Sequence, residues 1–418
     1  MKNERDGGGA PRPRAIYISP GDPWGSPRGG QTAFAKQALE AFGNRFAVVS
    51  PAEVDDIPVG RWTLGDWNGA PIWRFNIGSY APRNKSRAPL IPRRIVFRAL
   101  IKKYLPEIYK IGTKNIFCDS PEILGVLKKY QWDSFCYRFA GLNNPVAFSR
   151  YARLRFLGDW FHRRMLTDLA ALKPDALLAA ADAETTAQFS RDNERFLKGL
   201  TIASFPTRFD PSVFYPTDGL SERRELGWEE NYPRLLLAGR LSWIKGWDLA
   251  LDAAAILKRK FPKLKLIFVG DGEDRAKIEK RVRELGLQNE VQIEGFLPPK
   301  EVRRRLAAAD LYLISSLREG WSVASTEALA CGKRIVATDV SGVSETALEG
   351  KNGIVVKTRE PEAYAQALEA ALELPTENNV NEFSLAISER FSKERLRRDW
   401  AECWEPLADE REGNERAK

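Results

Sequence analysis

The sequence has few of the residues on which metal and disulfide chemistry depend. It contains one histidine, His162, and four cysteines, Cys118, Cys136, Cys331 and Cys403. The cysteines are scattered, with no CxxC pair and no metal-ligand spacing. A disulfide framework is therefore not expected, and the four cysteines indicate reduced thiols of a cytosolic protein.

Long apolar runs are also missing. No stretch approaches the roughly eighteen apolar residues that a membrane-spanning helix needs. The segment 1–14 is polar and rich in proline and glycine, and it lacks the apolar region of a signal peptide. We therefore expect no signal peptide, no membrane span and a cytoplasmic location.

What the chain does have is length, a globular composition and an uneven charge. Its 418 residues are 43% hydrophobic and 29% charged, enough for two domains with separate cores. Residues 1–212 hold 32 Lys and Arg against 20 Asp and Glu, whereas residues 213–418 hold 33 against 36. The first half should therefore face an anionic partner, either nucleic acid or a membrane surface.

Apolar runs and helical periodicity alternate along both halves, which predicts an α/β protein with parallel sheets. In the first half we expect strands at 15–19, 46–50, 114–119, 134–141 and 176–180, with helices at 32–42 and 148–172. The pattern restarts in the second half, with strands at 234–240, 265–273, 291–296, 311–316, 334–339 and 353–356, and helices at 247–260 and 275–286. The stretch 51–90 gives no clear prediction. Two doubly wound domains, 1–212 and 213–391, are expected.

Two cations follow the first strand of the second half. Arg240 ends this strand, and Lys245 precedes a helix, with Gly246 between Lys245 and the helix. Backbone N–H groups and the helix dipole make a strand–loop–helix junction an anion site. Arg240 and Lys245 suit a diphosphate there, although two solvated loop charges would be the better interpretation of an isolated pair.

Two glutamates lie eight residues apart in "EGWSVASTE". Ser322 is a candidate N-cap and Gly332 a helix end, so Glu319 lies just before a helix and Glu327 in its second turn. Open α/β sheets bind ligands above these strand ends. Two carboxylates suit a polyhydroxyl ligand. The alternative is that they have only structural roles, with one glutamate capping the helix and the other exposed to solvent.

These stretches together resemble the retaining glycosyltransferases of the GT-B fold, in particular family 4. The resemblance rests on "AGR", "KG", "GDGE", "EGWSVASTE" and "SGVSE" in that order, and covers roughly residues 201–357. It implies two Rossmann-like domains facing across a cleft, with a last helix at 392–407 returning to the first domain. It also implies a nucleoside-diphosphate sugar as donor, bound by residues 213–391.

The resemblance assigns roles to residues of the second half. Arg240 and Lys245 would bind the diphosphate and stabilise the leaving nucleotide, Glu319 would hold the transferred sugar, and Glu327 the ribose. Backbone amides at Trp321, Ser322 and Val323 would face sugar and phosphate, and Gly295 and Phe296 the base. Ser322 stands where the family usually has glycine. No metal or other cofactor is required, because these groups meet the charge of the diphosphate.

The first half carries fewer site residues. Gly29 and Gly30 precede the first helix, as in the family's first loop. Their backbone amides would approach and contact the donor phosphate. Asp119 follows a strand and would orient the acceptor. Ala140 occupies the place where many relatives carry a histidine. The single histidine, His162, lies on a predicted helix, where a surface or packing residue is expected, and no catalytic role is assigned to it.

We therefore expect a retaining hexosyltransferase acting on a glycan or lipid-linked acceptor in lipopolysaccharide, capsule or exopolysaccharide synthesis. One alternative is another GT-B enzyme, a sugar-phosphate synthase or a nucleotide-sugar epimerase. The epimerases lack the paired glutamates and cations. The other alternative is a nucleic-acid-binding protein, for which no RNP, KH or helix-turn-helix signature is present.

Basic residues cluster in the first half. Residues 83–114 hold ten Lys and Arg and one acid, Glu107. Phe97, Leu100, Ile101 and Tyr104 share a helical face beside a basic stripe of Arg94, Arg98 and Lys102, and a second basic-aromatic stretch spans 148–164. We expect peripheral attachment to the anionic inner face of the cytoplasmic membrane, against the alternative of an ordinary solvated face.

Overall fold

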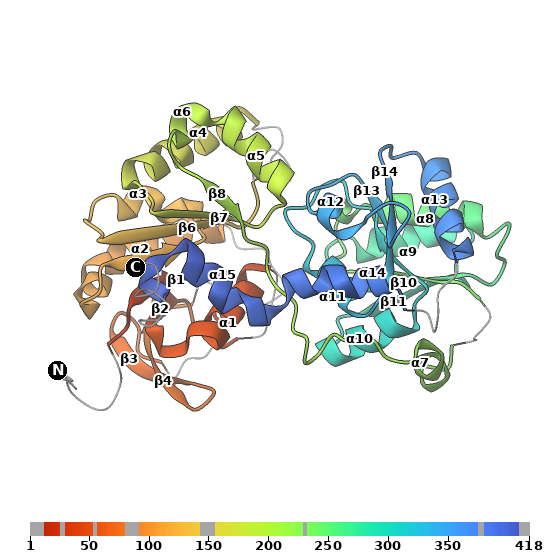
Figure 1. Cartoon of the computed structure of the whole chain (residues 1–418), viewed down its shortest axis with the longest axis horizontal. Coiled ribbons are helices and arrows are strands. Elements are labelled where there is room, and N and C mark those ends of the chain that lie inside the picture. Colours follow the sequence, from red (N-terminus) through yellow and green to blue (C-terminus); the bar gives the residue numbers. More distant parts are fainter. Residues whose placement is uncertain are drawn as a thin grey trace, which may run out of the picture. The chain divides into compact units, whose positions relative to one another are not determined.

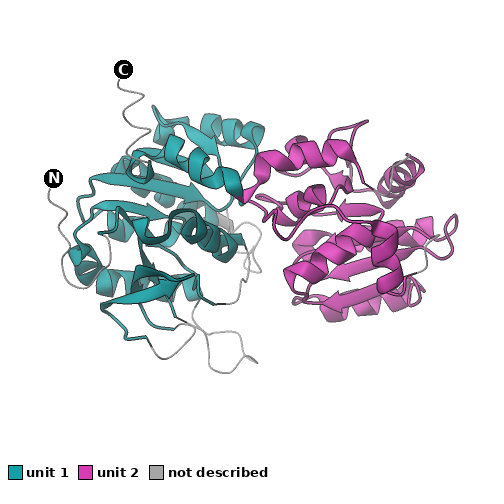
Figure 2. Ribbon diagram, turned by 60° about the horizontal axis from the view of Figure 1, so that its bottom comes forward, with its two compact units in different colours: residues 1–207, 394–418 teal, residues 208–393 magenta. Residues whose placement is uncertain are grey.

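The chain folds into two compact α/β units. The computed structural model describes residues 12–25, 30–52, 57–79, 92–142, 155–228, 232–374 and 380–408. Unit 1 comprises residues 1–207 and 394–418, and unit 2 comprises residues 208–393 (Figures 1 and 2).

The unit boundaries differ from the expected breaks at 212 and 391. The reason is a short pairing between the two ends of unit 2. Phe209 N donates to Phe391 O at 3.0 Å, and Lys393 N donates to Phe209 O at 2.9 Å. Lys393 Nζ also lies 2.6 Å from Asp210 Oδ2. These bonds place both ends in the same unit.

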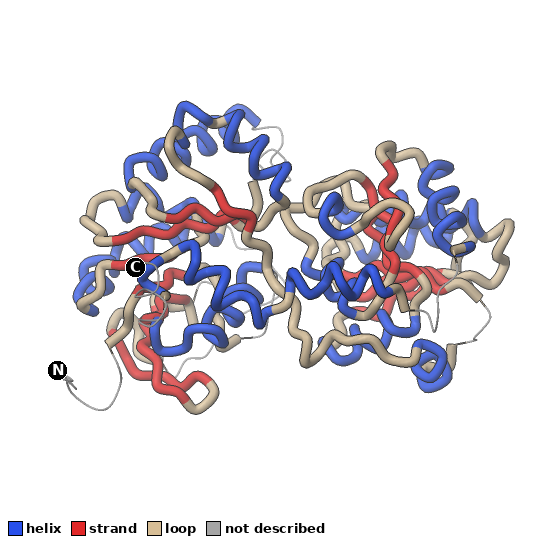
Figure 3. Tube along the Cα trace, viewed as in Figure 1, coloured by secondary structure: helices blue, strands red, loops and turns tan. Residues whose placement is uncertain are grey.

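Unit 1 is built on an eight-stranded sheet in the order β3-β4-β2-β1-β5-β6-β7-β8. Its strands are β1 (Ala15–Ile18), β2 (Phe46–Ser50), β3 (Trp62–Trp67), β4 (Ala70–Asn76), β5 (Asn115–Cys118), β6 (Ser134–Phe139), β7 (Ala176–Ala179) and β8 (Ile202–Ser204). All neighbours pair in parallel except β3 and β4, which form an antiparallel pair. Figure 3 shows the strands in red.

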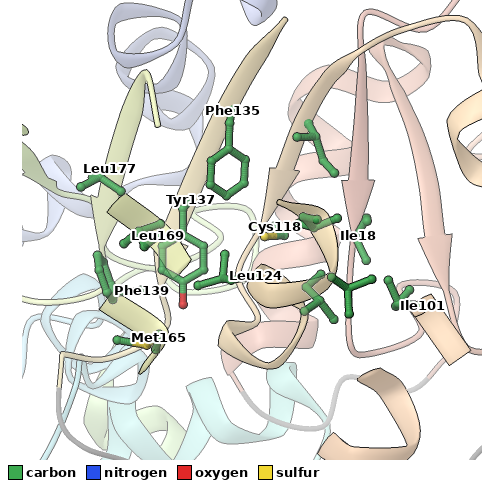
Figure 4. Close-up of a cluster of buried hydrophobic side chains, with 14 of the residues drawn as sticks. Ile18, Ile101, Cys118, Leu124, Phe135, Tyr137, Phe139, Met165, Leu169 and Leu177 are labelled. Carbon is green, nitrogen blue, oxygen red and sulfur yellow. The ribbon is translucent and has the colours of Figure 1, made fainter. Parts of the chain in front are cut away.

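Helices cover both faces of this sheet. They are α1 (Gly30–Phe42), α2 (Arg93–Ile108), α3 (Leu124–Leu127), α4 (Arg155–Leu172), α5 (Ala183–Asp192), α6 (Glu194–Leu197) and α15 (Leu396–Cys403). One core joins the sheet to α2, α3 and α4, and includes Ile18, Ile101, Tyr137 and Leu169 (Figure 4). The other core joins the sheet to α1 and α15.

The two cores follow from the alternation of side chains along buried strands. In β1, Ile16 and Ile18 enter the core with α2, whereas Ala15 and Tyr17 enter the core with α1. All four β1 residues are buried, because helices cover both faces of the sheet. A continuous apolar run therefore forms a strand rather than a membrane span.

Unit 2 is built on a six-stranded parallel sheet in the order β11-β10-β9-β12-β13-β14. The strands are β9 (Arg234–Ala238), β10 (Lys265–Val269), β11 (Val291–Gly295), β12 (Leu311–Ile314), β13 (Arg334–Thr338) and β14 (Gly353–Val356). The helices are α7 (Gly219–Glu225), α8 (Trp247–Leu257), α9 (Arg275–Glu284), α10 (Pro299–Ala308), α11 (Val323–Ala330), α12 (Val343–Thr346), α13 (Pro361–Glu373) and α14 (Glu382–Ser388). The predicted doubly wound α/β class is confirmed for both units.

Among the described residues, no helix is long and apolar enough to cross a membrane.

The predicted lipid-facing stripe on α2 is wrong. Phe97 and Ile101 are at most 2% exposed and pack into the core of unit 1, and Leu100 and Tyr104 lie partly buried against it. The apolar face of α2 is therefore already covered by the sheet and cannot enter a bilayer.

The basic stripe beside it is partly engaged within the protein. Arg94 forms an ion pair with Glu122, and Arg98 donates to the Glu122 carbonyl oxygen at 2.7 Å.

Candidate functional site

The loop from β9 to α8 carries the two predicted cations. Gly239 and Gly246 have φ of 142° and 63°, which L side chains rarely adopt. A Cβ at Gly246 would lie 1.8 Å from Ser315 O, so only glycine fits between this loop and the one after β12. Lys245 ends a short 3-10 turn, Trp243–Lys245, directly before α8.

The loop from β12 to α11 carries the paired carboxylates. Ser322 is the N-cap of α11, and its hydroxyl accepts from Ser325 N at 3.3 Å, which confirms the predicted cap. Gly332, with φ of 70°, follows the end of this helix. The backbone N–H groups that begin α11 lie between Glu319 and Glu327 in sequence, and free N–H groups at the start of a helix favour a nearby anion.

An ion pair joins the two loops. Lys245 Nζ lies 2.7 Å from Glu319 Oε1, and the two side chains are 23% and 10% exposed. Leu317 N donates to Ile244 O at 2.8 Å, and Ser315 Oγ donates to Lys245 O at 3.0 Å. The structure therefore brings together a predicted diphosphate ligand and a predicted sugar ligand.

Glu327 has a different environment. It is half-buried on α11, and in the described part of the chain its carboxyl group forms no ion pair and accepts no hydrogen bond. Burial raises the pKa of Glu327 to about 8. Burial, then the nearby Glu319 and Glu327, raises the pKa of Tyr312, whose hydroxyl donates to Ala238 O at 3.3 Å. Tyr312 therefore lies near both carboxylates.

Arg240 is the most exposed of the predicted ligands. Its side chain is 73% exposed and forms an ion pair with Glu273 at 2.9 Å. Glu273 belongs to the "GDGE" turn, which packs on the loop of Arg240, since a Cβ at Gly272 would lie 2.3 Å from Leu241 O. The turn thus supports the position of Arg240 through backbone contact and an exposed ion pair.

The remaining predicted donor residues lie at strand and helix ends. Trp321 is 9% exposed and packs on Phe391, with ring centroids 4.9 Å apart, while Val323 begins α11. Gly295 ends β11 with φ of 74°, and the next residue, Phe296, is 71% exposed. An exposed aromatic ring such as that of Phe296 has the chemistry to stack on a planar base.

Unit 1 gives a less complete site. Gly29 lies outside the described residues, and Gly30 begins α1 with open space where a Cβ would point. His162 is half-buried and packs edge-on against Phe189, and burial lowers its pKa. This contact agrees with a packing role for His162.

Asp119, the predicted acceptor ligand, is fully buried. It follows β5, and burial raises its pKa to about 7, while the nearby Arg138 acts in the opposite direction. Neither carboxyl oxygen has a hydrogen-bond partner among the described residues. Gln31 Nε2 donates to the Asp119 carbonyl oxygen at 3.0 Å. In this conformation the Asp119 carboxyl group is closed to an acceptor.

Ser316 is a site residue that the sequence did not reveal. Its Oγ donates to Glu319 Oε1 at 2.6 Å, the same oxygen that Lys245 contacts. A serine three residues before a glutamate is common in turns, so the sequence gives no specific signal for this contact. The pairing of Arg240 with Glu273 was missed for a different reason, since 33 residues separate the two.

Comparisons with known proteins agree with this geometry. Residues 220–390 match the family described as "Glycosyl transferases group 1". The chain is 32% identical over 168 residues to a D-inositol 3-phosphate glycosyltransferase of Corynebacterium urealyticum, covering 38% of this chain and 39% of that protein. It is 28% identical over 199 residues to the putative glycosyltransferase EpsD of Bacillus subtilis, covering 47% and 50%. The chain thus spans at most about half the length of these curated relatives.

Two solved structures resemble nearly the whole chain. Sucrose-phosphate synthase from Thermosynechococcus elongatus has a TM-score of 0.73 at 20% identity, covering 91% of this chain and 96% of that one. HepE of Anabaena, in complex with UDP and glucose, has a TM-score of 0.65 at 20% identity, covering 93% and 98%. The chain has the GT-B fold, and its residues 220–390 are similar to the group 1 glycosyltransferases.

Proposed function

We propose that the protein transfers a hexose, with retention of configuration, from a nucleoside-diphosphate sugar to a hydroxyl of a glycan or lipid-linked acceptor. The observation that carries this proposal is the contact of Lys245 with Glu319 beside the N-terminus of α11. It places a cation for the diphosphate next to a carboxylate for the sugar. HepE, which shares the fold, has been solved with UDP-glucose, which supports a nucleotide-sugar donor.

Different residues are proposed to bind different parts of the donor molecule. Lys245 and Arg240 bind the diphosphate, Glu319 accepts hydrogen bonds from hexose hydroxyls, and Glu327 accepts from the ribose. The backbone amides of Trp321, Ser322 and Val323, at the start of α11, face the sugar and phosphate, and Phe296 and Gly295 lie by the base. The cations and helix ends meet the charge of the diphosphate, so the mechanism needs no metal.

The proposed chemistry is a displacement on the front face of the hexose. The bond between the anomeric carbon and the phosphate oxygen breaks, and a bond from the acceptor oxygen to that carbon forms on the same face. The acceptor proton passes to the departing phosphate oxygen, so no separate protein base takes part. Lys245 and Arg240 stabilise the charge that develops on the leaving group.

The proposed pathway is cell-surface polysaccharide synthesis, such as lipopolysaccharide, capsule or exopolysaccharide. Asp119 is proposed to orient the acceptor; in the described conformation its carboxyl group is buried. Relatives named D-inositol 3-phosphate glycosyltransferase and sucrose-phosphate synthase favour a second candidate, a phosphorylated sugar or polyol acceptor.

We further propose cytoplasmic location with peripheral attachment to anionic lipid through unit 1. The support is the exposed set of cations on α2 and α4, which comprises Arg93, Lys102, Lys103, Arg163 and Arg164, together with Trp160 at 65% exposed. Because the apolar face of α2 is buried, attachment rests on charge and on Trp160 rather than on an inserted helix.

The test of the function is a panel of nucleotide sugars in thermal unfolding and product-release assays. A donor present at a hundred times its dissociation constant should add about 2.7 kcal/mol to the stability of unit 2. That donor should also release its nucleoside diphosphate when the acceptor is present. Glycan, lipid-linked and phosphorylated acceptors, tried in turn, distinguish the two candidate functions. No stabilisation and no release with any donor would refute the proposal.

A further inference from the structure

Ser316 lies behind the carboxyl group of Glu319. It is 3% exposed and directly follows Ser315 in the loop after β12. Its Oγ donates to Glu319 Oε1 at 2.6 Å, and Lys245 Nζ lies 2.7 Å from the same oxygen. One carboxyl oxygen therefore accepts from a neutral hydroxyl and from a cation at once.

The backbone of Ser316 is itself fixed. Thr338 Oγ1, from the end of β13, donates to Ser316 O at 2.6 Å and lies 3.1 Å from Ile314 O. Thr338 is 3% exposed, so water does not compete for these bonds. These bonds hold the backbone of Ser316 against the end of β13, which limits where its side chain can lie relative to Glu319.

Lys245 and Ser316, which both contact Glu319, differ in what they do when the donor arrives. Under the proposed function, on which this inference rests, Lys245 turns to the diphosphate, because two phosphates offer it more negative charge than one carboxylate. Glu319 Oε1 then loses the bond to Lys245. Ser316 is not a ligand of the diphosphate and keeps its bond.

We propose that Ser316 is the positioning residue of Glu319, holding its carboxylate toward the hexose after Lys245 has left it for the diphosphate. The hydroxyl contacts neither the sugar nor the phosphate. It fixes one carboxyl oxygen so that the carboxylate keeps one orientation during transfer. A carboxylate that rotates would spend part of its time away from the hexose hydroxyls.

The test compares Ser316→Ala with Ser316→Thr in steady-state transfer and in calorimetry with the free nucleoside diphosphate. The alanine variant should lower kcat roughly 10- to 150-fold, the range for a lost hydrogen bond to a charged group. Its affinity for the free nucleoside diphosphate should stay within about twofold of the wild type, because the diphosphate and ribose ligands remain. Threonine keeps the hydroxyl and should restore most of the lost turnover.

A matched control separates positioning from general loss of packing. Ser384 is equally buried and donates to Lys333 O at 2.7 Å, away from both loops of the site. Ser384→Ala should lower the melting temperature without changing kcat. In a Glu319→Gln background, adding Ser316→Ala should cause little further loss, because Ser316 acts through that carboxylate.

The outcomes distinguish this inference from the proposed function. If Glu319→Gln loses turnover while Ser316→Ala keeps it, the positioning role is wrong and the function stands. If Ser316→Ala lowers nucleotide affinity as much as kcat, the serine supports the whole loop, and the inference is also overturned. If Glu319→Gln itself transfers sugar normally, the proposed function fails first.

Discussion

Glu319 and Glu327 differ in what surrounds their carboxyl groups, although the sequence presents them as a pair. Glu319 forms an ion pair with Lys245 and accepts a hydrogen bond from Ser316. Glu327 lacks such partners in the described part of unit 2, and burial raises its pKa to about 8. Burial therefore disfavours the charged form of Glu327, and a better-solvated or ligand-bound state would favour its ionisation.

The two carboxylates should fail in different ways when each is changed to glutamine. Glu319→Gln should lower kcat about 100-fold or more and leave affinity for the free nucleoside diphosphate nearly unchanged, since it serves the hexose. Glu327→Gln should weaken that affinity by about 10-fold, since it serves the ribose. Calorimetry with the nucleoside diphosphate and steady-state kinetics measure the two effects. Equal losses of affinity in both variants would contradict the division of roles.

Asp119 should make unit 1 less stable as the pH rises. Its pKa in the folded protein is about 7, above the ordinary value of 3.8, because burial disfavours the charged form. Between pH 4 and 7 the folded state therefore binds more protons than the unfolded state, and stability falls as pH increases through this window. Asp119→Asn should flatten that slope and make the protein more stable than wild type at pH 8, by up to about 4 kcal/mol.

Urea unfolding at a series of pH values measures this effect. The titratable groups that interact with the Asp119 carboxyl group are Arg138, Glu122, Tyr17, Cys118 and Tyr137, and none of them is altered in the variant. Asp133→Asn, at an exposed position of the same unit, is the matched control and should leave the slope as it is. If Asp119→Asn shows the same dependence of stability on pH as the wild type, another titrating group is responsible for it.

At the scale of elements, most strands and the main helices could be predicted from the sequence. The runs at 15–19 and 234–240 became β1 and β9, because parallel strands buried on both faces are continuously apolar. The hairpin of β3 and β4 was missed in a stretch rich in proline, glycine and tryptophan. Its turn, Asn68-Gly69 with φ of 52° and 84°, carries the Asn-Gly signal of a hairpin.

The candidate site was predictable in its residues but not in its contacts. The local sequence pattern alone predicts that Lys245, Glu319 and Ser322 lie in loops or at helix ends. The Lys245 to Glu319 bond joins residues 74 positions apart, and it depends on the order of β9 and β12 in the sheet. The burial of the apolar face of α2 likewise depends on which helix covers the sheet, which an amphipathic pattern does not specify.

The helix α15 should be required for the stability of unit 1. Trp400 is fully buried and its ring contacts Phe34, Phe42, Phe46, Phe117 and Phe205. Trp400→Ala should therefore destabilise unit 1 by about 3–5 kcal/mol. Glu402→Ala, at an exposed position of the same helix, is the control and should change stability by less than about 0.5 kcal/mol.

Chemical denaturation followed by tryptophan fluorescence measures this difference. Because the chain has two units, the unfolding of unit 1 is to be analysed separately from that of unit 2. A loss below about 1 kcal/mol in Trp400→Ala would mean that α15 contributes little to the core with α1.

At the scale of the whole molecule, the excess of positive charge in unit 1 predicts that this unit binds anionic membranes. Changing Lys102, Lys103 and Arg163 to Glu reverses three exposed cations of unit 1 that form no ion pair in the described chain. Each cation near an anionic surface contributes about 1 kcal/mol, so the triple variant should lose most binding to anionic vesicles. Wild type should sediment with anionic but not neutral vesicles, and high salt should release it.

A variant with the same change in charge in unit 2 is the control. Changing Arg259, Arg283 and Lys300 to Glu alters exposed positions there, and should leave vesicle binding nearly intact. If both triple variants lose binding equally, net charge rather than unit 1 governs attachment. Wild-type binding that ignores lipid charge would rule out the electrostatic surface altogether.

The central claim is that unit 2 holds a nucleoside-diphosphate sugar with Lys245 on its diphosphate. Calorimetry of Lys245→Ala and wild type with UDP, GDP and ADP tests it most directly. The account predicts that one of these nucleotides binds the wild type, and that the variant binds it roughly 10- to 150-fold more weakly, the loss of a charge-assisted contact. Equal affinity in the two proteins, or no binding of any nucleoside diphosphate to the wild type, would contradict it.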